Sequence, residues 1–206
     1  MKRKHIIFDL DGTLSNTAKA TFAATEEGTK KHGLPVVSYE KILEAMGIAG
    51  LDFYALLYPK ASKEELQKIE QIINPAEERM IKQLGEEILF PDIIEMLEAL
   101  DESGHTIYIA STGSQSHVHT TLEATWIGEF FAEVHCGRPE KVSMVKEIIK
   151  GRDPSQWAMV GDMYKDSEAA KGNNILAIGA GFGYLAKEDE KLFDKVIAKP
   201  MDIMKL

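Results

Sequence analysis

Short apolar runs rich in β-branched residues recur along this chain, and segments with helical periodicity separate most of them. This alternation is typical of an α/β domain with a largely parallel sheet, because each helix carries the chain back to the start of the next strand. We therefore predict an α/β fold. The predicted strands span 4–10, 106–111, 131–136, 156–161, 175–179 and 195–198.

Two segments, 92–100 and 141–150, have the apolar spacing of helices that cover a sheet. Each repeats apolar residues every three or four positions, which places them on one side of a helix. The predicted buried faces consist of Ile93, Leu97 and Leu100 in the first helix and of Val142, Val145, Ile148 and Ile149 in the second.

A long interval between the first two predicted strands interrupts the alternation. Residues 16–90 read as helical throughout, and they are too many for a simple crossover connection. We therefore predict an inserted all-helical domain at 16–87, with the α/β core formed by 1–15 and 88–206. The chain would cross between the two parts at 14–17 and again at 85–91, and these crossings are a predicted hinge.

One helix of the insertion has a clear start signal. Ser62-Lys63-Glu64-Glu65 has the form of a capping box, in which the first and last residues exchange hydrogen bonds with each other's backbone. The helix that follows carries an apolar stripe of Leu66, Ile69, Ile72 and Ile73.

Two carboxylates stand where the first predicted strand gives way to a glycine turn, in Ile6-Ile7-Phe8-Asp9-Leu10-Asp11-Gly12-Thr13. Side chains two positions apart in an extended chain point to the same side, so Asp9 and Asp11 should project together. Their repulsion persists only if something compensates it. A bound cation is the simplest compensation, and oxygen ligands of this kind suit Mg²⁺.

Other polar residues stand at the ends of later predicted strands. The second strand ends in Ser111-Thr112-Gly113, and the fourth in Gly161-Asp162, with Asp166 four residues later. Lys141 begins the helix after the third strand. Because ligands bind at the carboxyl ends of strands in parallel α/β sheets, these residues are candidates for a single site.

Composition limits the classes of partner. The 206 residues contain 24 Lys and Arg against 33 Asp and Glu, a formal charge of −9 that argues against nonspecific binding to nucleic acid or to an anionic membrane. The first apolar run covers only 6–8, so we expect no signal peptide, no membrane span and a cytoplasmic location. Cys136 stands alone, which excludes an internal disulfide and a thiolate zinc cluster.

Over nearly its whole length the chain resembles the haloacid dehalogenase superfamily of phosphotransferases. The resemblance lies in four motifs that occur in the family's order. They are Asp9-Leu10-Asp11-Gly12-Thr13, Ser111, Lys141 and Gly161-Asp162-Met163-Tyr164-Lys165-Asp166. Leu89-Phe90-Pro91 and Gly181-Phe182-Gly183 are similar to segments of the phosphoglycolate phosphatase branch, which carries a helical cap directly after the first motif.

The resemblance implies a Rossmann-like three-layer core with a helical cap, and a Mg²⁺-dependent phosphatase acting on a small phosphorylated metabolite. Asp9 would attack phosphorus and form an aspartyl phosphate. Asp11 would act first as acid and then as base. Asp9, the backbone carbonyl of Asp11, and Asp162 would hold Mg²⁺.

The remaining motif residues receive binding roles from the same resemblance. Ser111 and Lys141 would hold the phosphoryl oxygens, together with the turns around Gly12 and Thr112. These turns also contain Thr13 and Gly113. Asp166 would orient Lys141 or a metal-bound water.

Several assignments have competitors. Arg138, which precedes Pro139 as the motif lysine does in many relatives, competes with Lys141. His117 and His119 are two apart on a predicted helix and do not share a face, so they are interpreted as solvated residues. The glycine-rich segment 179–183 is predicted to be a loop beside the site. Gly47-Ile48-Ala49-Gly50 lies in the region that faces the substrate in relatives.

Two alternative functions stay open. A phosphosugar mutase of the β-phosphoglucomutase type shares both aspartates, although Thr13 stands where the mutases favour valine. A catalytically silent protein could use the phosphate pocket to sense a ligand. The sequence predicts neither the substrate nor the choice between monomer and homodimer.

Overall fold

The computed structural model describes residues 4–48 and 50–205. Its centre is a six-stranded sheet in the order β3-β2-β1-β4-β5-β6, and every neighbouring pair of strands is parallel. The strands are β1 (His5–Phe8), β2 (Thr106–Ala110), β3 (Phe131–His135), β4 (Trp157–Gly161), β5 (Leu176–Ala180) and β6 (Lys195–Ile197). The predicted α/β class is confirmed, and all six predicted strands are present with ends that differ by a few residues.

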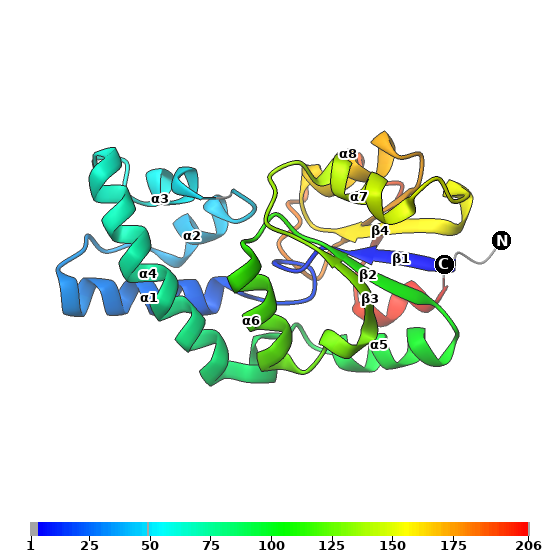
Figure 1. The fold of residues 1–206 in the computed structure, drawn as a ribbon, viewed down its shortest axis with the longest axis horizontal. Coiled ribbons are helices and arrows are strands. Elements are labelled where there is room, and N and C mark those ends of the chain that lie inside the picture. The colour runs from blue at the N-terminus through cyan, green and yellow to red at the C-terminus, as the bar shows by residue number, and fades with distance from the viewer. Residues whose placement is uncertain (1–3, 49, 206) are drawn as a thin grey trace.

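Helices cover both faces of the sheet, which gives three layers (Figure 1). Alternate residues of β1 divide between the two faces, since Ile6 and Phe8 pack with α5 (Ile93–Glu102) and α6 (Gln115–Thr125). Ile7 packs on the opposite side. There the cover consists of α7 (Lys141–Ile149) and α8 (Tyr164–Gly172).

The buried faces of the two predicted covering helices are largely confirmed. Ile93, Leu97 and Leu100 are at most 1% exposed. The prediction for Val142 is wrong, because this side chain is 41% exposed. Each residue turns a helix by about 100°, so a face that includes Lys141 and Val145 leaves Val142 at its edge.

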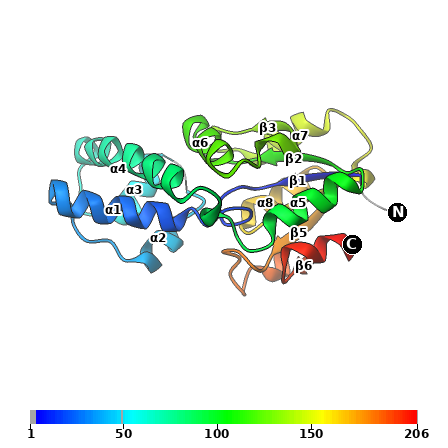
Figure 2. The same cartoon turned by 90° about the horizontal axis from the view of Figure 1, so that it is seen from below.

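The segment between β1 and β2 is helical, as predicted. It contains α1 (Ala18–His32), α2 (Tyr39–Ala45), α3 (Leu51–Leu57) and α4 (Lys63–Leu84), followed by a 3₁₀ helix at Gly85–Ile88. These helices lie to one side of the sheet (Figures 1 and 2), and they bury a separate apolar cluster that includes Leu66, Ile69 and Ile73. The capping box of Ser62 and Glu65 is present at the start of α4.

The two chain crossings lie side by side. Asn16 N donates to Ile88 O at 2.7 Å, and Phe90 N donates to Leu14 O at 3.1 Å. The predicted boundaries at 15/16 and 87/88 therefore fall within one small hydrogen-bonded junction, next to the first motif. Among the described helices, none has the length and apolar composition that a membrane span requires.

Candidate active site

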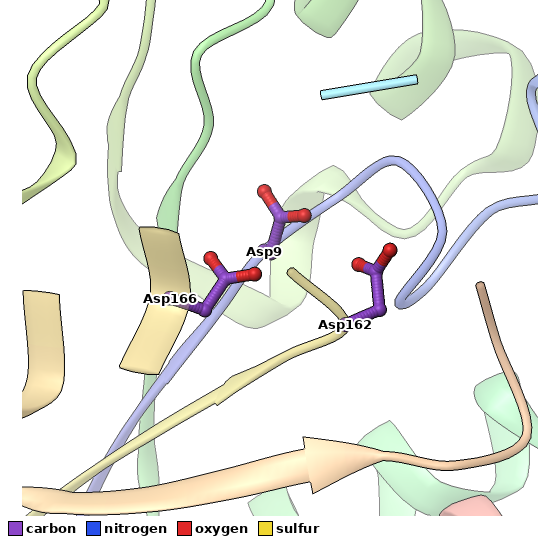
Figure 3. A group of neighbouring side chains, drawn as sticks. All are labelled: Asp9, Asp162 and Asp166. Atoms are coloured by element: carbon purple, nitrogen blue, oxygen red, sulfur yellow. The ribbon is translucent and has the colours of Figure 1, made fainter. Parts of the chain in front are cut away.

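The nucleophile candidate lies at the middle of the sheet. Asp9 follows β1, whose neighbours are β2 and β4, and its backbone N–H donates to Val160 O at 2.9 Å. Asp162 follows β4, so the two acids leave adjacent parallel strands at the same edge. Asp166 lies in the first turn of α8. One carboxylate oxygen from each acid lies within 4.8 Å of the others (Figure 3), and all three side chains are buried.

Lys141 closes this acid cluster at the start of α7. Its Nζ lies 2.6 Å from Asp9 Oδ1 and 2.6 Å from Asp166 Oδ1, and the lysine is 5% exposed. The second oxygen of Asp166 accepts the N–H of Met163 at 2.9 Å. Both Asp166 oxygens are thus engaged, which is what a residue that orients Lys141 requires.

Arg138 has a different environment. Its side chain is 42% exposed and donates to both carboxylate oxygens of Glu147, at 2.8 and 2.7 Å. The structure therefore places Lys141 beside Asp9 and directs Arg138 to the surface.

The electrostatics of the cluster follow from burial. Burial raises the pKa of Asp9 to about 7, against the opposing charge of Lys141. Burial and the charge of Asp9 raise the pKa of Asp162 well above its usual range. Lys141 is stabilised as a cation, because the two carboxylates beside it outweigh burial and raise its pKa. The cluster carries three carboxylates against one ammonium.

The residues present fit a divalent cation. Asp162 Oδ2 is buried and has no hydrogen-bond partner among the described residues, whereas Asp162 Oδ1 accepts the Thr13 hydroxyl at 2.7 Å. A buried carboxylate oxygen without a partner costs free energy unless a ligand satisfies it. Oxygen donors of this kind suit Mg²⁺.

Gly12 and Thr13, in the turn after β1, lie directly against Asp162. Gly12 has φ +85°, and a Cβ at this position would lie 2.4 Å from Asp162 Oδ2. The Gly12 N–H donates to Ser15 O at 2.8 Å, and the Thr13 hydroxyl is directed to Asp162. The donors of Gly12 and Thr13 are thus used by Ser15 and Asp162, and the contact of these two residues with substrate stays a prediction.

The predicted loop at 179–183 begins only at Gly181, because Gly179 and Ala180 belong to β5. Tyr184 N donates to Gly12 O at 3.2 Å, and a Cβ at Gly183 would lie 1.8 Å from that same oxygen. Only glycine permits this close approach. The loop thus supports the first motif from the side away from β2.

Ser111 follows β2 on the other side of Asp9 and is 1% exposed. Its Oγ accepts the N–H of Gly113 at 3.1 Å, which leaves the hydroxyl proton free to donate. Thr112 and Gly113 line the same pocket. Of the substrate-binding residues expected from the sequence, these two face the pocket.

The pocket lies between the α/β part and the helical part. Asp9, Asp11, Ser111 and Lys141 line it on one side. Residues of the helical part line the other side, including Gly47, Ile48, Gly50, Phe53 and Glu70. Three residues of the segment 47–50 therefore line the pocket, and Ala49 lies outside the described residues.

Asp11 contacts a residue that the sequence interpretation assigned to solvent. His117 Nε2 lies 2.9 Å from Asp11 Oδ1, and His117 Nδ1 lies 3.8 Å from Glu77 Oε2 of α4. The solvated interpretation is wrong for His117, whose side chain is 16% exposed, and correct for the exposed His119. Spacing within one helix gave no signal of this contact, since both partners come from other segments.

This contact shifts both pKa values. Burial raises the pKa of Asp11, but the charge and hydrogen bond of His117 outweigh it and leave the pKa below its usual value. Burial lowers the pKa of His117, and Asp11 and Glu77 outweigh it to give a pKa of about 9.

The family model of haloacid dehalogenase-like hydrolases matches residues 6–180, which is well over half of the chain. The chain belongs to this family. Among curated haloacid dehalogenase-like hydrolases, it is 30% identical over 190 residues to a phosphoglycolate phosphatase of Agrobacterium fabrum, covering 86% of this chain and 80% of that protein. It is an enzyme of the phosphatase type.

Solved structures of the haloacid dehalogenase-like family share the fold. A hydrolase from Streptococcus pneumoniae superposes with a TM-score of 0.83 at 24% identity, covering 98% of this chain and 97% of that one. A β-phosphoglucomutase from Clostridium difficile superposes with a TM-score of 0.77 at 18% identity, covering 98% and 93%. At these identities the likeness concerns the fold alone.

Proposed function

We propose that the protein is a Mg²⁺-dependent phosphomonoester hydrolase that acts on a small phosphorylated metabolite through an aspartyl phosphate, with residues 16–87 as its cap domain. The observation that carries the proposal is the position of Lys141 Nζ, 2.6 Å from both Asp9 and Asp166. This lysine holds the nucleophile candidate in place and offers a cation beside it, where a phosphoryl group would enter.

In the first step, an oxygen of Asp9 attacks phosphorus, and the bond from phosphorus to the ester oxygen breaks. The departing alcohol takes a proton from the Asp11 carboxyl group. The products of this step are the free alcohol, an acyl phosphate on Asp9 and the Asp11 carboxylate. Asp9 and Asp11 both line the pocket, so one substrate can reach both.

In the second step, a water molecule attacks phosphorus of the acyl phosphate, and Asp11 takes one of its protons. The bond between phosphorus and the Asp9 oxygen breaks, which restores the Asp9 carboxylate and releases inorganic phosphate. Asp11 then holds the proton that the next alcohol needs. Acid and base duties therefore alternate on one side chain.

Asp9, Asp162 and the backbone carbonyl of Asp11 would hold Mg²⁺. The side chain of Asp11 is engaged by His117, and both oxygens of Asp166 are engaged by Lys141 and Met163, which leaves Asp9 and Asp162 as the carboxylate ligands. When bound, the ion offsets the negative charge that nucleophile and substrate share.

Ser111 and Lys141 would bind the phosphoryl oxygens. The Ser111 hydroxyl keeps its proton for donation, and Thr112 offers a backbone N–H that has no partner within the described chain. Such donors stabilise developing negative charge because they are fixed before the reaction begins. The helical part would exclude water, and Lys165 Nζ joins it to the α/β part by donating to Gly47 O at 3.0 Å.

A phosphoglycolate phosphatase-like activity is the nearest label, supported by the name of the Agrobacterium fabrum relative. Phosphosugar mutase activity and a silent ligand-binding role are the alternatives. A cytoplasmic location and a monomer or homodimer, free of nucleic acid and membrane partners, remain predictions.

Phosphate release from a panel of small phosphate esters, measured with Mg²⁺ and with a chelator, tests the proposal. We expect release that the chelator abolishes and that Asp9→Asn abolishes in a folded protein. An isomerised sugar phosphate in place of free phosphate would favour the mutase. Binding of an ester without any turnover would favour the silent role.

A further inference from the structure

His117 links the acid–base candidate to the helical part of the molecule. The residue lies in the first turn of α6, and its Nε2 is 2.9 Å from Asp11 Oδ1. An ionised carboxylate can only accept hydrogen bonds, so Nε2 carries the hydrogen in this contact. Its other ring nitrogen is 3.8 Å from Glu77 Oε2 of α4, and Glu77 also accepts the hydroxyl of Thr21 from α1. Four separate segments thus determine where the ring lies.

The contact determines which oxygen of Asp11 is available for chemistry. Oδ1 accepts the His117 N–H, so we expect Oδ2, which this contact leaves open, to exchange protons with substrate or water. Lys141 cannot take up this proton, because its nitrogen is already an ammonium group that donates to Asp9 and Asp166. Asp11 and His117 are 17% and 16% exposed and line the pocket, so the contact forms part of the reaction chamber.

We propose that His117, steadied by Glu77, is a positioning residue that holds Asp11 as the base for hydrolysis of the aspartyl phosphate. This inference rests on the proposed phosphatase function. In that step the attacking water gives one proton to Asp11 Oδ2, and His117 keeps its own proton throughout. A fixed carboxylate is required because proton transfer needs hydrogen-bond reach and alignment.

An aryl phosphate substrate allows the role of Asp11 as a base to be measured apart from its role as an acid. The p-nitrophenolate group leaves without a proton, so formation of the aspartyl phosphate from p-nitrophenyl phosphate needs no acid. For this substrate kcat/KM reports the steps through p-nitrophenolate release, whereas kcat also includes hydrolysis of the intermediate. If Asp11 is no longer held in position, kcat should therefore fall much more than kcat/KM.

The test compares His117→Ala with wild type and with His119→Ala, a matched control on the exposed side of the same helix. We expect His117→Ala to lower kcat about tenfold or more, and kcat/KM by less than about threefold. Rapid mixing should then show a burst of p-nitrophenolate close to one per enzyme molecule. His119→Ala should resemble wild type.

Two further variants keep the test valid if His117→Ala does not fold. His117→Gln retains an amide N–H near the Nε2 position and should keep most of kcat, whereas Glu77→Gln removes the charge beside the ring and should give an intermediate kcat. Equal losses of kcat and kcat/KM without a burst, or an unchanged kcat, would overturn the inference. A wild-type protein that releases no phosphate from any ester would instead overturn the proposed function itself, and the inference with it.

Discussion

Asp166 joins Lys141 to the first turn of α8, because Oδ1 accepts from the lysine ammonium at 2.6 Å while Oδ2 accepts the Met163 N–H at 2.9 Å. One buried carboxylate thus fixes both the Lys141 ammonium and the loop that carries Asp162. We expect Asp166→Asn to lower kcat more than about tenfold, because a misplaced charge loses its value for the transition state. Phosphate release and a thermal melt measure the two effects. Glu168→Gln, on the exposed side of the same helix, is the control and should change neither.

The choice between Lys141 and Arg138 has a direct test. Lys141→Ala leaves Asp9 and Asp166 buried without their cation, so both activity and stability should fall, the latter by about 3 kcal/mol or more. Arg138→Ala removes only a solvent-screened ion pair with Glu147, so stability should change little. Denaturant unfolding together with phosphate release distinguishes the two residues. Loss of turnover in Arg138→Ala at unchanged stability would reverse the assignment.

Gly12 provides a test of the crowded turn under the acid cluster. A Cβ at Gly12 would lie 2.4 Å from Asp162 Oδ2, whereas a Cβ at Gly33 meets no atom within 4 Å. Both glycines have positive φ, so each alanine variant bears a backbone cost of about 1–2 kcal/mol. Only Gly12→Ala also displaces Asp162, and only this variant should lose Mg²⁺ binding, as measured by calorimetry. Equal Mg²⁺ binding by the two alanine variants would show that the chain relieves the clash at position 12 without moving Asp162.

Removal of the metal should make stability depend on pH in a defined direction. Burial raises the pKa of Asp9 to about 7 from 3.8. In a chelator the folded state therefore keeps this proton to a higher pH than the unfolded chain does, and stability should fall as the pH rises from about 4 to about 7. Mg²⁺ would bind the ionised carboxylates, so it should raise Tm more at the upper end of this window than at the lower end.

Asp162→Asn is the matched variant for that measurement. Removal of one buried negative charge should raise Tm in the chelator, because burial and the charge of Asp9 both disfavour the Asp162 carboxylate. The same change should remove most of the stabilisation by Mg²⁺. A variant that still gains full stability from Mg²⁺ would show that the ion binds elsewhere.

The helical wall of the pocket predicts a preference among substrates. Glu70, Glu77 and Glu78 line the same pocket as Asp9 and Asp11. A carboxylate on the leaving alcohol meets like charge there, so Glu70→Gln should lower KM for phosphoglycolate about two- to threefold. For an uncharged alcohol of similar size KM should change little. Glu64→Gln, exposed on the same helix, is the control.

The sequence predicted those parts of the molecule that local patterns determine. Strand ends place Asp9, Ser111 and Asp162 at one edge of the sheet, and this follows from apolar runs and the parallel topology alone. The third-motif lysine was predicted because Lys141 begins an apolar helix, and the helix does carry it to Asp9.

Contacts between distant segments could not be predicted in this way. His117 meets Asp11 and Glu77 only after the helical part has packed against α6, and no spacing along the chain encodes that packing. Gly12 and Thr13 show a related limit. Their motif identity is clear, but the partners of their donors depend on how the turn closes on Ser15 and Asp162.

The pairing of β1 has a consequence for the order in which this protein assembles. His5 pairs with Thr106 on one side and with Trp157 on the other, so the strand that precedes Asp9 can pair fully only after both partner strands have been synthesised. Helices α1 to α4 leave the ribosome well before them, and they can condense through contacts near in sequence. We therefore expect nascent chains that end before β4 to be structured in their helical part and catalytically inert, with the reactive centre completed near the end of translation.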